Sequence, residues 1–112
     1  MLNHIAVTGN LTADPELRKT GGGVPTCSFT VACERDRRGP NGEKEVDFID
    51  CVAWRSNAEF VAGKFKKSSG ITVSGRLQIR NWVDKQENKR RTAEIDVENV
   101  YFADARPSVK EG

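Results

Sequence analysis

The sequence predicts an all-β fold, a small barrel of five strands with one short helix between the third and fourth strands. Five runs of residues alternate apolar and polar side chains with a period of two, which is typical of half-buried strands. Loops rich in glycine, proline and charge separate these runs. The stretch after the third run instead has apolar residues at helical spacing, which indicates the helix.

Length and composition limit the class of protein. The chain has 112 residues, which suits one domain with a single core. Hydrophobic residues make up 37% and charged residues 30%, and no apolar run approaches the roughly 20 residues of a membrane helix. The start, MLNHIAVTGN, lacks the basic lead and apolar stretch of a secretion signal. We therefore expect a soluble, cytoplasmic protein with no membrane partner.

The first two strands are expected at residues 3–11 and 26–34, each with its odd-numbered side chains facing the core. Between them, TADPELRKTGGGVP indicates a long loop with room for one short turn at residues 15–18. DRRGPNGEKE, residues 36–45, is typical of a flexible, charged hairpin tip. The third strand follows at residues 46–54; it is apolar on both faces, and its two aromatic residues share one of them.

The helix is expected to begin at Ser56. Glu59 stands three residues later, and this spacing predicts a capping box, in which the serine hydroxyl and the glutamate satisfy free backbone amides. Apolar residues recur at helical spacing as far as Phe65, which extends the predicted helix to Lys67 before SSG ends the segment.

The last two strands are expected at residues 71–79 and 92–102. Their predicted inward side chains are Ile71, Val73, Leu77 and Ile79 in the fourth strand, and Ala93, Ile95, Val97 and Tyr101 in the fifth. The remaining residues are typical of a tail. The expected organisation is therefore one OB-fold domain at 1–103 and a short C-terminal tail at 104–112.

The choice of the OB-fold depends on the order of the elements. Five short strands with long tips and a helix after the third match this partly open barrel, which binds oligonucleotides or oligosaccharides on one face. An SH3-like barrel is the alternative, but its usual order has no capped helix at this place.

The residue types that catalysis and metal binding require are scarce. Cys27, Cys33 and Cys51 are odd in number and lack C-x-x-C spacing, so we interpret them as small buried hydrophobes of a reduced protein. His4 is the single histidine, and no serine or cysteine stands in a nucleophile motif. We therefore expect no enzyme activity, no metal and no cofactor.

Trp82 carries the functional interpretation. If the fourth strand continues without a bulge, parity places Trp82 with Arg76 and Arg80 on the outward face. An outward aromatic beside cations suits a nucleobase, which stacks on the ring while phosphates meet the charges. With Phe48 and Trp54, which share one face of the third strand, Trp82 would form a stacking platform. A single outward tryptophan can also close a barrel end or fill a subunit interface, and this alternative stays open.

Cations near this platform are candidates for phosphate contacts. A guessed hairpin register would place Arg80 opposite Glu94 and Arg76 opposite Glu98 as cross-strand ion pairs, so loop cations with fewer acidic neighbours are the better candidates. The set of candidate phosphate ligands is Arg37, Arg38, Lys44, Arg80, Lys85, Lys89 and Arg90.

Two motifs resemble those of the bacterial-type single-stranded DNA-binding proteins, and the resemblance covers nearly the whole chain. GNLTADPELR resembles the family's G-N-L-x-x-D-P-E-x-R signature, and GRLQIRNWVD is similar to its G-x-L-x-x-R-x-W-x-D segment. By position, the resemblance makes Phe48, Trp54 and Trp82 the stacking aromatics. It implies an OB-fold without catalysis, a homotetramer that binds single strands with little sequence preference, and a cytoplasmic, nucleoid-associated role in DNA replication, recombination and repair.

Three features depart from the family pattern. ERDRRGPNG carries charge where many members have another aromatic, and Ile49 stands where a histidine often lies at the tetramer contact. The sequence ends at RPSVKEG, without the Gly/Pro-rich linker and acidic tip through which bacterial members recruit replication and repair enzymes. A trimmed chain and a short form, such as phages and mobile elements encode, both remain open, and so does the recruitment of those enzymes.

A protein from a different functional class could carry the same residues. In an OB-fold subunit that docks a replication partner, the aromatics would serve a protein interface. Such an adaptor would show no length-dependent retention of single strands in filter binding, which separates the two hypotheses. An enzyme is the weakest of the three.

Overall fold

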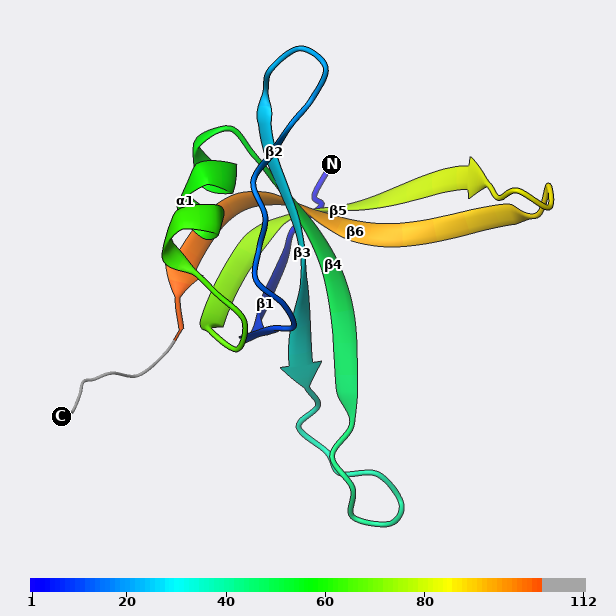
Figure 1. Ribbon diagram of the computed structural model, residues 1–112. Helices are drawn as coiled ribbons and strands as arrows, with labels where there is room; N and C mark the ends of the chain where they lie inside the picture. Colours follow the sequence, from blue (N-terminus) through cyan, green and yellow to red (C-terminus); the bar gives the residue numbers. More distant parts are fainter. Residues whose placement is uncertain (104–112) are drawn as a thin grey trace, which may run out of the picture.

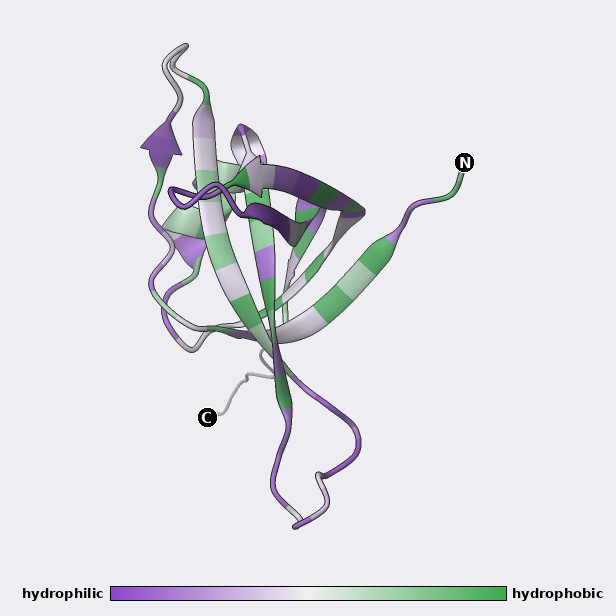
Figure 2. Ribbon diagram, turned by 90° about the vertical axis from the view of Figure 1, so that its right-hand side faces the viewer, coloured by the Kyte–Doolittle hydropathy of each residue, from purple (hydrophilic) through white to green (hydrophobic). Residues whose placement is uncertain are grey.

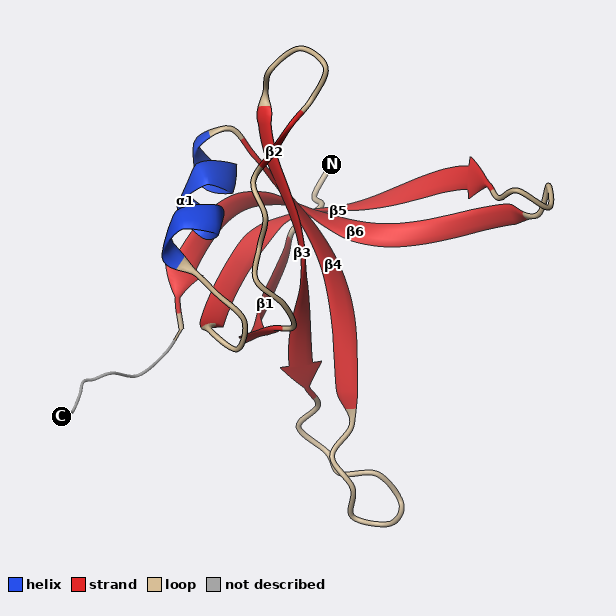
Figure 3. Cartoon of the chain, in the orientation of Figure 1, coloured by secondary structure: helices blue, strands red, loops and turns tan. Residues whose placement is uncertain are grey.

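The computed structural model describes residues 1–103, so the tail expected at 104–112 lies outside the described residues. The elements in chain order are β1 (Ile5–Leu11), β2 (Arg18–Lys19), β3 (Pro25–Glu34), β4 (Val46–Trp54), α1 (Ser56–Lys64), β5 (Gly70–Val83) and β6 (Lys89–Phe102) (Figures 1 and 3). The short turn expected at 15–18 is absent, because residues 14–17 have no regular structure and Arg18 begins β2. Within the described part of the chain, no helix is long and apolar enough to cross a membrane.

Five of the strands close into a ring. The sheet order runs β1, β5, β6, β4, β3, and the ring closes where β3 pairs with the end of β1 at Leu11 and Val31. β4 and β6 run parallel, and the other pairs are antiparallel. β2 pairs with the start of β3. The five-stranded OB-fold barrel is confirmed, with α1 between its third and fourth strands.

The core fills the ring and the space beneath α1. Along the strands, hydrophobic and hydrophilic bands alternate (Figure 2), as expected for strands with one face on a core. The larger fully buried side chains are Val31, Val61, Ile71, Val73 and Ile95. Cys27 and Cys51 belong to this core, and burial raises the pKa of the Cys51 thiol to about 12. Cys33 is partly buried against the core. Burial thus keeps the Cys51 thiol protonated and unreactive.

β5 and β6 continue beyond the barrel as a two-stranded hairpin that projects into solvent, which we call the arm, residues 76–94 (Figure 1). All of β5 from residue 76 onward is exposed. Leu77, Ile79 and Ala93 were expected to face the core, and this expectation is wrong. Their parity is that of the core residues, but the strands have left the barrel at this point, and only the N-terminal segment, bonded through Asn3 to Leu77, partly covers that side.

A β-bulge marks the place where the arm begins. Ser74 pairs with Asn99 while Gly75 pairs with Val97, so β6 contains one extra residue at this point. The insertion shifts the parity of the last residues of β6, and Val100 packs against the core. Tyr101 is therefore exposed, and its expected inward position is wrong. β5 keeps its own parity through the bulge.

The helix begins without the predicted capping box. Ser56 is already the first helical residue, and the N-cap is Arg55, with φ 58° and ψ −126° and no side-chain capping bond. The Arg55 N–H donates to the Pro25 carbonyl at 2.8 Å, which fixes this sharp change of direction after β4. The helix ends at Lys64 and not at Lys67, because the next residue is extended.

Candidate nucleic-acid interface

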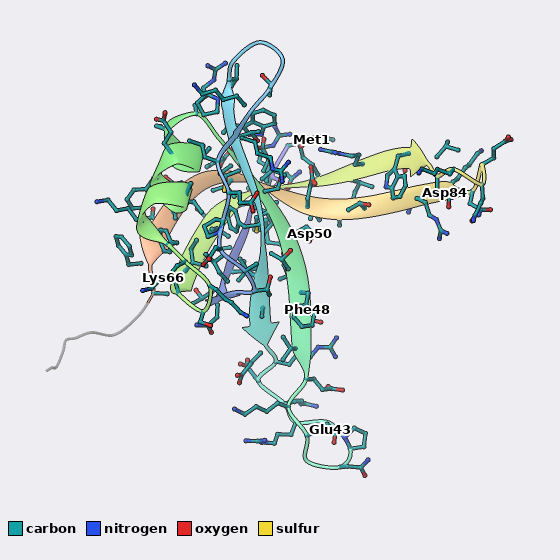
Figure 4. The ribbon with its side chains drawn as sticks, viewed as in Figure 1. Met1, Glu43, Phe48, Asp50, Lys66 and Asp84 are labelled. Carbon is teal, nitrogen blue, oxygen red and sulfur yellow. The ribbon has the colours of Figure 1, made fainter. Side chains whose placement is uncertain are left out.

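Three aromatic side chains from β4 and β5 are exposed. The exposed fraction is 68% for Phe48, 41% for Trp54 and 46% for Trp82. Leaving large aromatic rings in water forgoes the burial that usually stabilises a fold, so such exposure indicates a surface available for contact. Figure 4 places Phe48 on β4, away from the barrel core.

The register shows that these aromatics share one outward face. Asp50 of β4 pairs with Glu94 of β6, and Glu94 pairs in turn with Gln78 of β5. Residues paired in one row point to the same side of a sheet, as do alternate residues along each strand. The even-numbered residues of β4 and of the arm therefore form one surface, which we call the aromatic face. It carries Phe48, Trp54 and Trp82.

Trp82 lies near the outer end of the arm. Its indole Nε1–H donates to Thr92 Oγ1 at 2.9 Å, and its cross-strand partner is Arg90. Both residues line a hollow of about 660 Å³. The complete lining is Asn81, Trp82, Val83, Lys89, Arg90 and Arg91.

Asp84 organises the turn at the end of the arm (Figure 4). Its Oδ1 accepts hydrogen bonds from the backbone N–H groups of Gln86 and Asn88, both at 2.9 Å, and its Oδ2 accepts one from Arg90 Nε at 2.9 Å. The backbone N–H of Asn88, followed by Arg90, lowers the pKa of Asp84. The carboxylate is therefore held in its charged form beside Arg90.

The guessed hairpin register is wrong. Arg80 pairs with Thr92, and Arg76 pairs with Asp96. An ion pair between Arg80 and Glu94 still forms, diagonally across the strands, at 2.9 Å. No ion pair joins Arg76 to Glu98 among the described residues, since Glu98 lies at the bulge.

The other candidate phosphate ligands fall into two groups, one at the tip between β3 and β4 and one on the arm. At the first tip, Lys44 Nζ lies 3.8 Å from Glu34, and Arg38 donates to the Gly42 carbonyl at 3.2 Å. Within residues 1–103, three candidates make no hydrogen bond or ion pair through their side chains: Arg37, Lys85 and Lys89. The cations thus lie at two separate hairpins, with Arg90 on the aromatic face and Lys89, the partner of Val83, on the opposite face of the arm.

Sequence reasoning missed two further arginines, Arg35 at the base of the β3–β4 hairpin and Arg18 in line with the aromatic face. Arg35 donates Nε and Nη2 to Asp47 at 3.1 and 2.9 Å, which fastens the base of the hairpin next to Phe48. Arg18 lies in one cross-strand row with Thr26 and Trp54, through the pairings of β2, β3 and β4. The opposite charges of Arg35 and Asp47, on either side of the hairpin tip, could have predicted their ion pair. Nothing in the sequence indicated that Arg18 joins the sheet.

The opposite face of the arm exposes three large apolar side chains beside the polar Asn81, Lys89 and Arg91. Leu77, Ile79 and Val83 are exposed on it, and Met1 and Leu2 lie near its base, where a hollow of about 1080 Å³ opens. The Asn3 side chain bonds both the N–H and the carbonyl of Leu77 at 2.9 Å, which holds the N-terminal segment along this face. We call this surface the apolar face.

Within residues 1–103, no group of three or more His, Cys, Asp and Glu side chains is arranged to hold a metal ion.

Comparison with known proteins gives the family. Residues 2–103 match the single-strand binding protein family. Single-stranded DNA-binding protein 2 of Listeria monocytogenes is 42% identical over 112 residues, which is all of this chain and 70% of that protein. Single-stranded DNA-binding protein A of Bacillus subtilis is 43% identical over 106 residues, which is 95% of this chain and 62% of that protein. The chain spans about two thirds of these relatives, and it belongs to the single-strand binding protein family.

Proposed function

We propose that this protein binds single-stranded DNA with little sequence preference, by stacking bases on Phe48, Trp54 and Trp82. The observation that carries the proposal is that all three rings are exposed on the same side of β4 and the arm. Every base has a π-face, so such a platform accepts any sequence. For single-strand-binding OB-folds as a class, the known scale is roughly 1 to 3 kcal/mol per stacked base.

The phosphates are met by the cations at the two hairpins. The first group is Arg37, Arg38 and Lys44, and the second is Arg80, Lys85, Lys89 and Arg90. Arg80 is the weakest of the set, because its guanidinium is already paired with Glu94. The net charge is only +2, so attraction depends on where the cations lie: residues 84–91 carry four cations and two acids, whereas residues 34–45 carry four of each.

A homotetramer is part of the proposal. Its support is the apolar face of the arm, where Leu77, Ile79 and Val83 lie exposed. Monomeric proteins rarely leave contiguous apolar surface in water, and a second copy of the same chain would cover it. The aromatic face lies on the other side of the arm and stays available for DNA.

The cellular role proposed is protection of single strands during DNA replication, recombination and repair, without catalysis, in the cytoplasm and on the nucleoid. The names of the relatives, which are single-stranded DNA-binding proteins, support the ligand. Binding without chemistry also agrees with a site composed of aromatic rings and cations.

Titration with oligo-dT tests the proposal. Stacking should quench the fluorescence of the two tryptophans, and duplex DNA should bind far more weakly. Trp54→Ala and Trp82→Ala should each weaken binding, by roughly 5- to 150-fold if each ring stacks one base. The matched control is Tyr101→Ala, an exposed aromatic whose partner is Thr72, at the far end of β5 from the arm.

Unchanged affinity in both tryptophan variants would contradict the stacking platform. A filter-binding series with oligo-dT of increasing length separates the proposed function from that of a protein adaptor. Retention that did not depend on oligonucleotide length would favour the adaptor.

A further inference from the structure

Two side chains that are proposed to contact DNA are held by neighbours that have no assigned role. Thr92 Oγ1 accepts the indole N–H of Trp82 at 2.9 Å. Asp84 Oδ2 accepts Nε–H of Arg90, also at 2.9 Å. A tryptophan and an arginine at the end of a solvent-exposed hairpin would otherwise sample several rotamers, so each bond selects one orientation in advance.

The two carboxylate oxygens of Asp84 accept hydrogen bonds from different donor groups. Oδ1 accepts from the backbone N–H groups of Gln86 and Asn88, which anchors the carboxylate to the turn. Oδ2 accepts Nε–H of Arg90 at 2.9 Å and, at the longer distance of 3.5 Å, the side-chain amide of Asn88. Only Nε of Arg90 is used in this way, and within residues 1–103 its two Nη groups make no other bond. Arg90 is thus fixed in place and still able to donate to a ligand.

Trp82 and Arg90 are near enough to serve one nucleotide. They are cross-strand partners and line the same hollow of about 660 Å³. A base stacked on the indole would bring its own phosphate toward the guanidinium. Side chains that already have the bound orientation lose less entropy on binding, so preset rotamers raise affinity without adding a contact.

We propose that Thr92 and Asp84 are positioning residues of a preassembled one-nucleotide subsite, in which Trp82 stacks the base and Arg90 binds the phosphate. This inference rests on the proposed binding of single-stranded DNA. It adds to that function a distinction between the two residues that contact the DNA and the two that orient these contacts before DNA binds.

The first test uses Thr92→Val, which keeps the shape and β-branching of the side chain but removes the acceptor. In a Trp54→Phe background, Trp82 is the sole tryptophan. In the free protein, acrylamide should then quench Trp82 more strongly, and affinity for oligo-dT should fall roughly 2- to 10-fold, as for the loss of one hydrogen bond. Thr92→Ser should restore both values. In a Trp82→Phe background, Thr92→Val should leave the emission of Trp54 in the free protein unchanged.

The second test uses Asp84→Asn. The amide can keep the two turn bonds through its oxygen, while its NH₂ group replaces Oδ2 and opposes the Nε–H donor of Arg90. The subsite predicts weaker binding, again roughly 2- to 10-fold, although a negative charge near DNA has been removed. The control is Glu87→Gln at the same turn, which removes an equal charge from a side chain without hydrogen bonds in the described chain. Its affinity should stay equal or rise.

The outcomes distinguish this inference from the proposed function. Failure of the parent protein to bind oligo-dT would refute the function and the subsite together. Normal binding by the parent, with equal or tighter binding by Thr92→Val and Asp84→Asn, would refute the positioning roles alone. Both variants should keep the melting temperature of the parent, because the arm lies outside the core. A loss of affinity that came with a lower melting temperature would indicate a structural role and would also overturn the inference.

Discussion

At the scale of single residues, Arg35 shows how an exposed charge can order a hairpin. It donates two hydrogen bonds to Asp47, and its Nη1 lies 3.6 Å from Glu45. Water and salt screen such exposed pairs, so they add little to global stability. Their effect is local, since the bonds fasten the base of the hairpin beside Phe48.

The Arg35–Asp47 pair predicts a pH dependence. The hydrogen bond from Arg35 lowers the pKa of Asp47 in the folded protein. The unfolded chain therefore binds this proton more readily, and the contribution of the pair is present above the ordinary aspartate pKa of about 4 and is lost as pH falls through the lower folded value. Amide hydrogen exchange at Arg35, whose N–H bonds the Glu45 carbonyl, should accelerate over this range relative to the intrinsic rate. Asp47→Asn should remove this dependence, and an identical pH profile in the variant would contradict the assignment.

At the scale of elements, two glycines allow strands to approach closely where a side chain would not fit. A Cβ on Gly75 would overlap the carbonyl oxygen of Asp96 at the bulge, and one on Gly9 would overlap that of Ala32 where β1 meets β3. In both cases the obstacle is backbone of the neighbouring strand, which cannot move without breaking ladder hydrogen bonds. These two sites define where the arm begins and where the ring closes.

Gly75→Ala should therefore destabilise the protein, by about 1 to 3 kcal/mol in the free energy of unfolding, as overpacking does elsewhere. Urea denaturation followed by circular dichroism measures this. Gly63→Ala is the matched control, because Gly63 lies in α1 and a Cβ there would meet nothing within 4 Å. This control should gain up to about 1 kcal/mol, since alanine favours the helix. Equal stability of the two variants would contradict the close approach at the bulge.

Periodicity predicted the strands and the outward side of Trp82 because both depend on local alternation alone. It could not predict that Leu77 and Ile79 are exposed, since parity gives the side of a strand but not whether another element lies opposite. The capping box failed for a similar reason: Arg55 turns the chain through a left-handed conformation imposed by its contact with β3. The holding bonds of Asp84 depend on the turn geometry of the arm, which the sequence leaves open.

At the scale of the whole molecule, the distribution of charge predicts how binding responds to salt. Phosphates that meet cations release counterions, so log affinity should fall with log salt by about 0.7 per phosphate neutralised on a single strand. Replacing Lys85 and Lys89 together by Gln should make this slope shallower. The control is Lys64→Gln at the end of α1, away from the arm, which should leave the slope unchanged. A slope that both sets of variants changed equally would indicate a general charge effect and not contacts at the arm.

Assembly is a second property of the whole molecule, and the proposed tetramer has its interface on the arm. Four copies of the 12.4 kDa chain give about 50 kDa, which light scattering at micromolar concentration should detect for the free protein. Ile79→Glu places a charge on the apolar face. Burying an unpaired carboxylate between copies is costly, so this variant should form a smaller species. Ile79 is exposed in the single chain and lies outside the core, so the variant should keep the fold of the parent.

Lys85→Glu, a charge change at the turn of the same arm, should remain tetrameric. A parent protein that scattered light as a monomer would contradict the tetramer, and a tetrameric Ile79→Glu would place its interface on another surface.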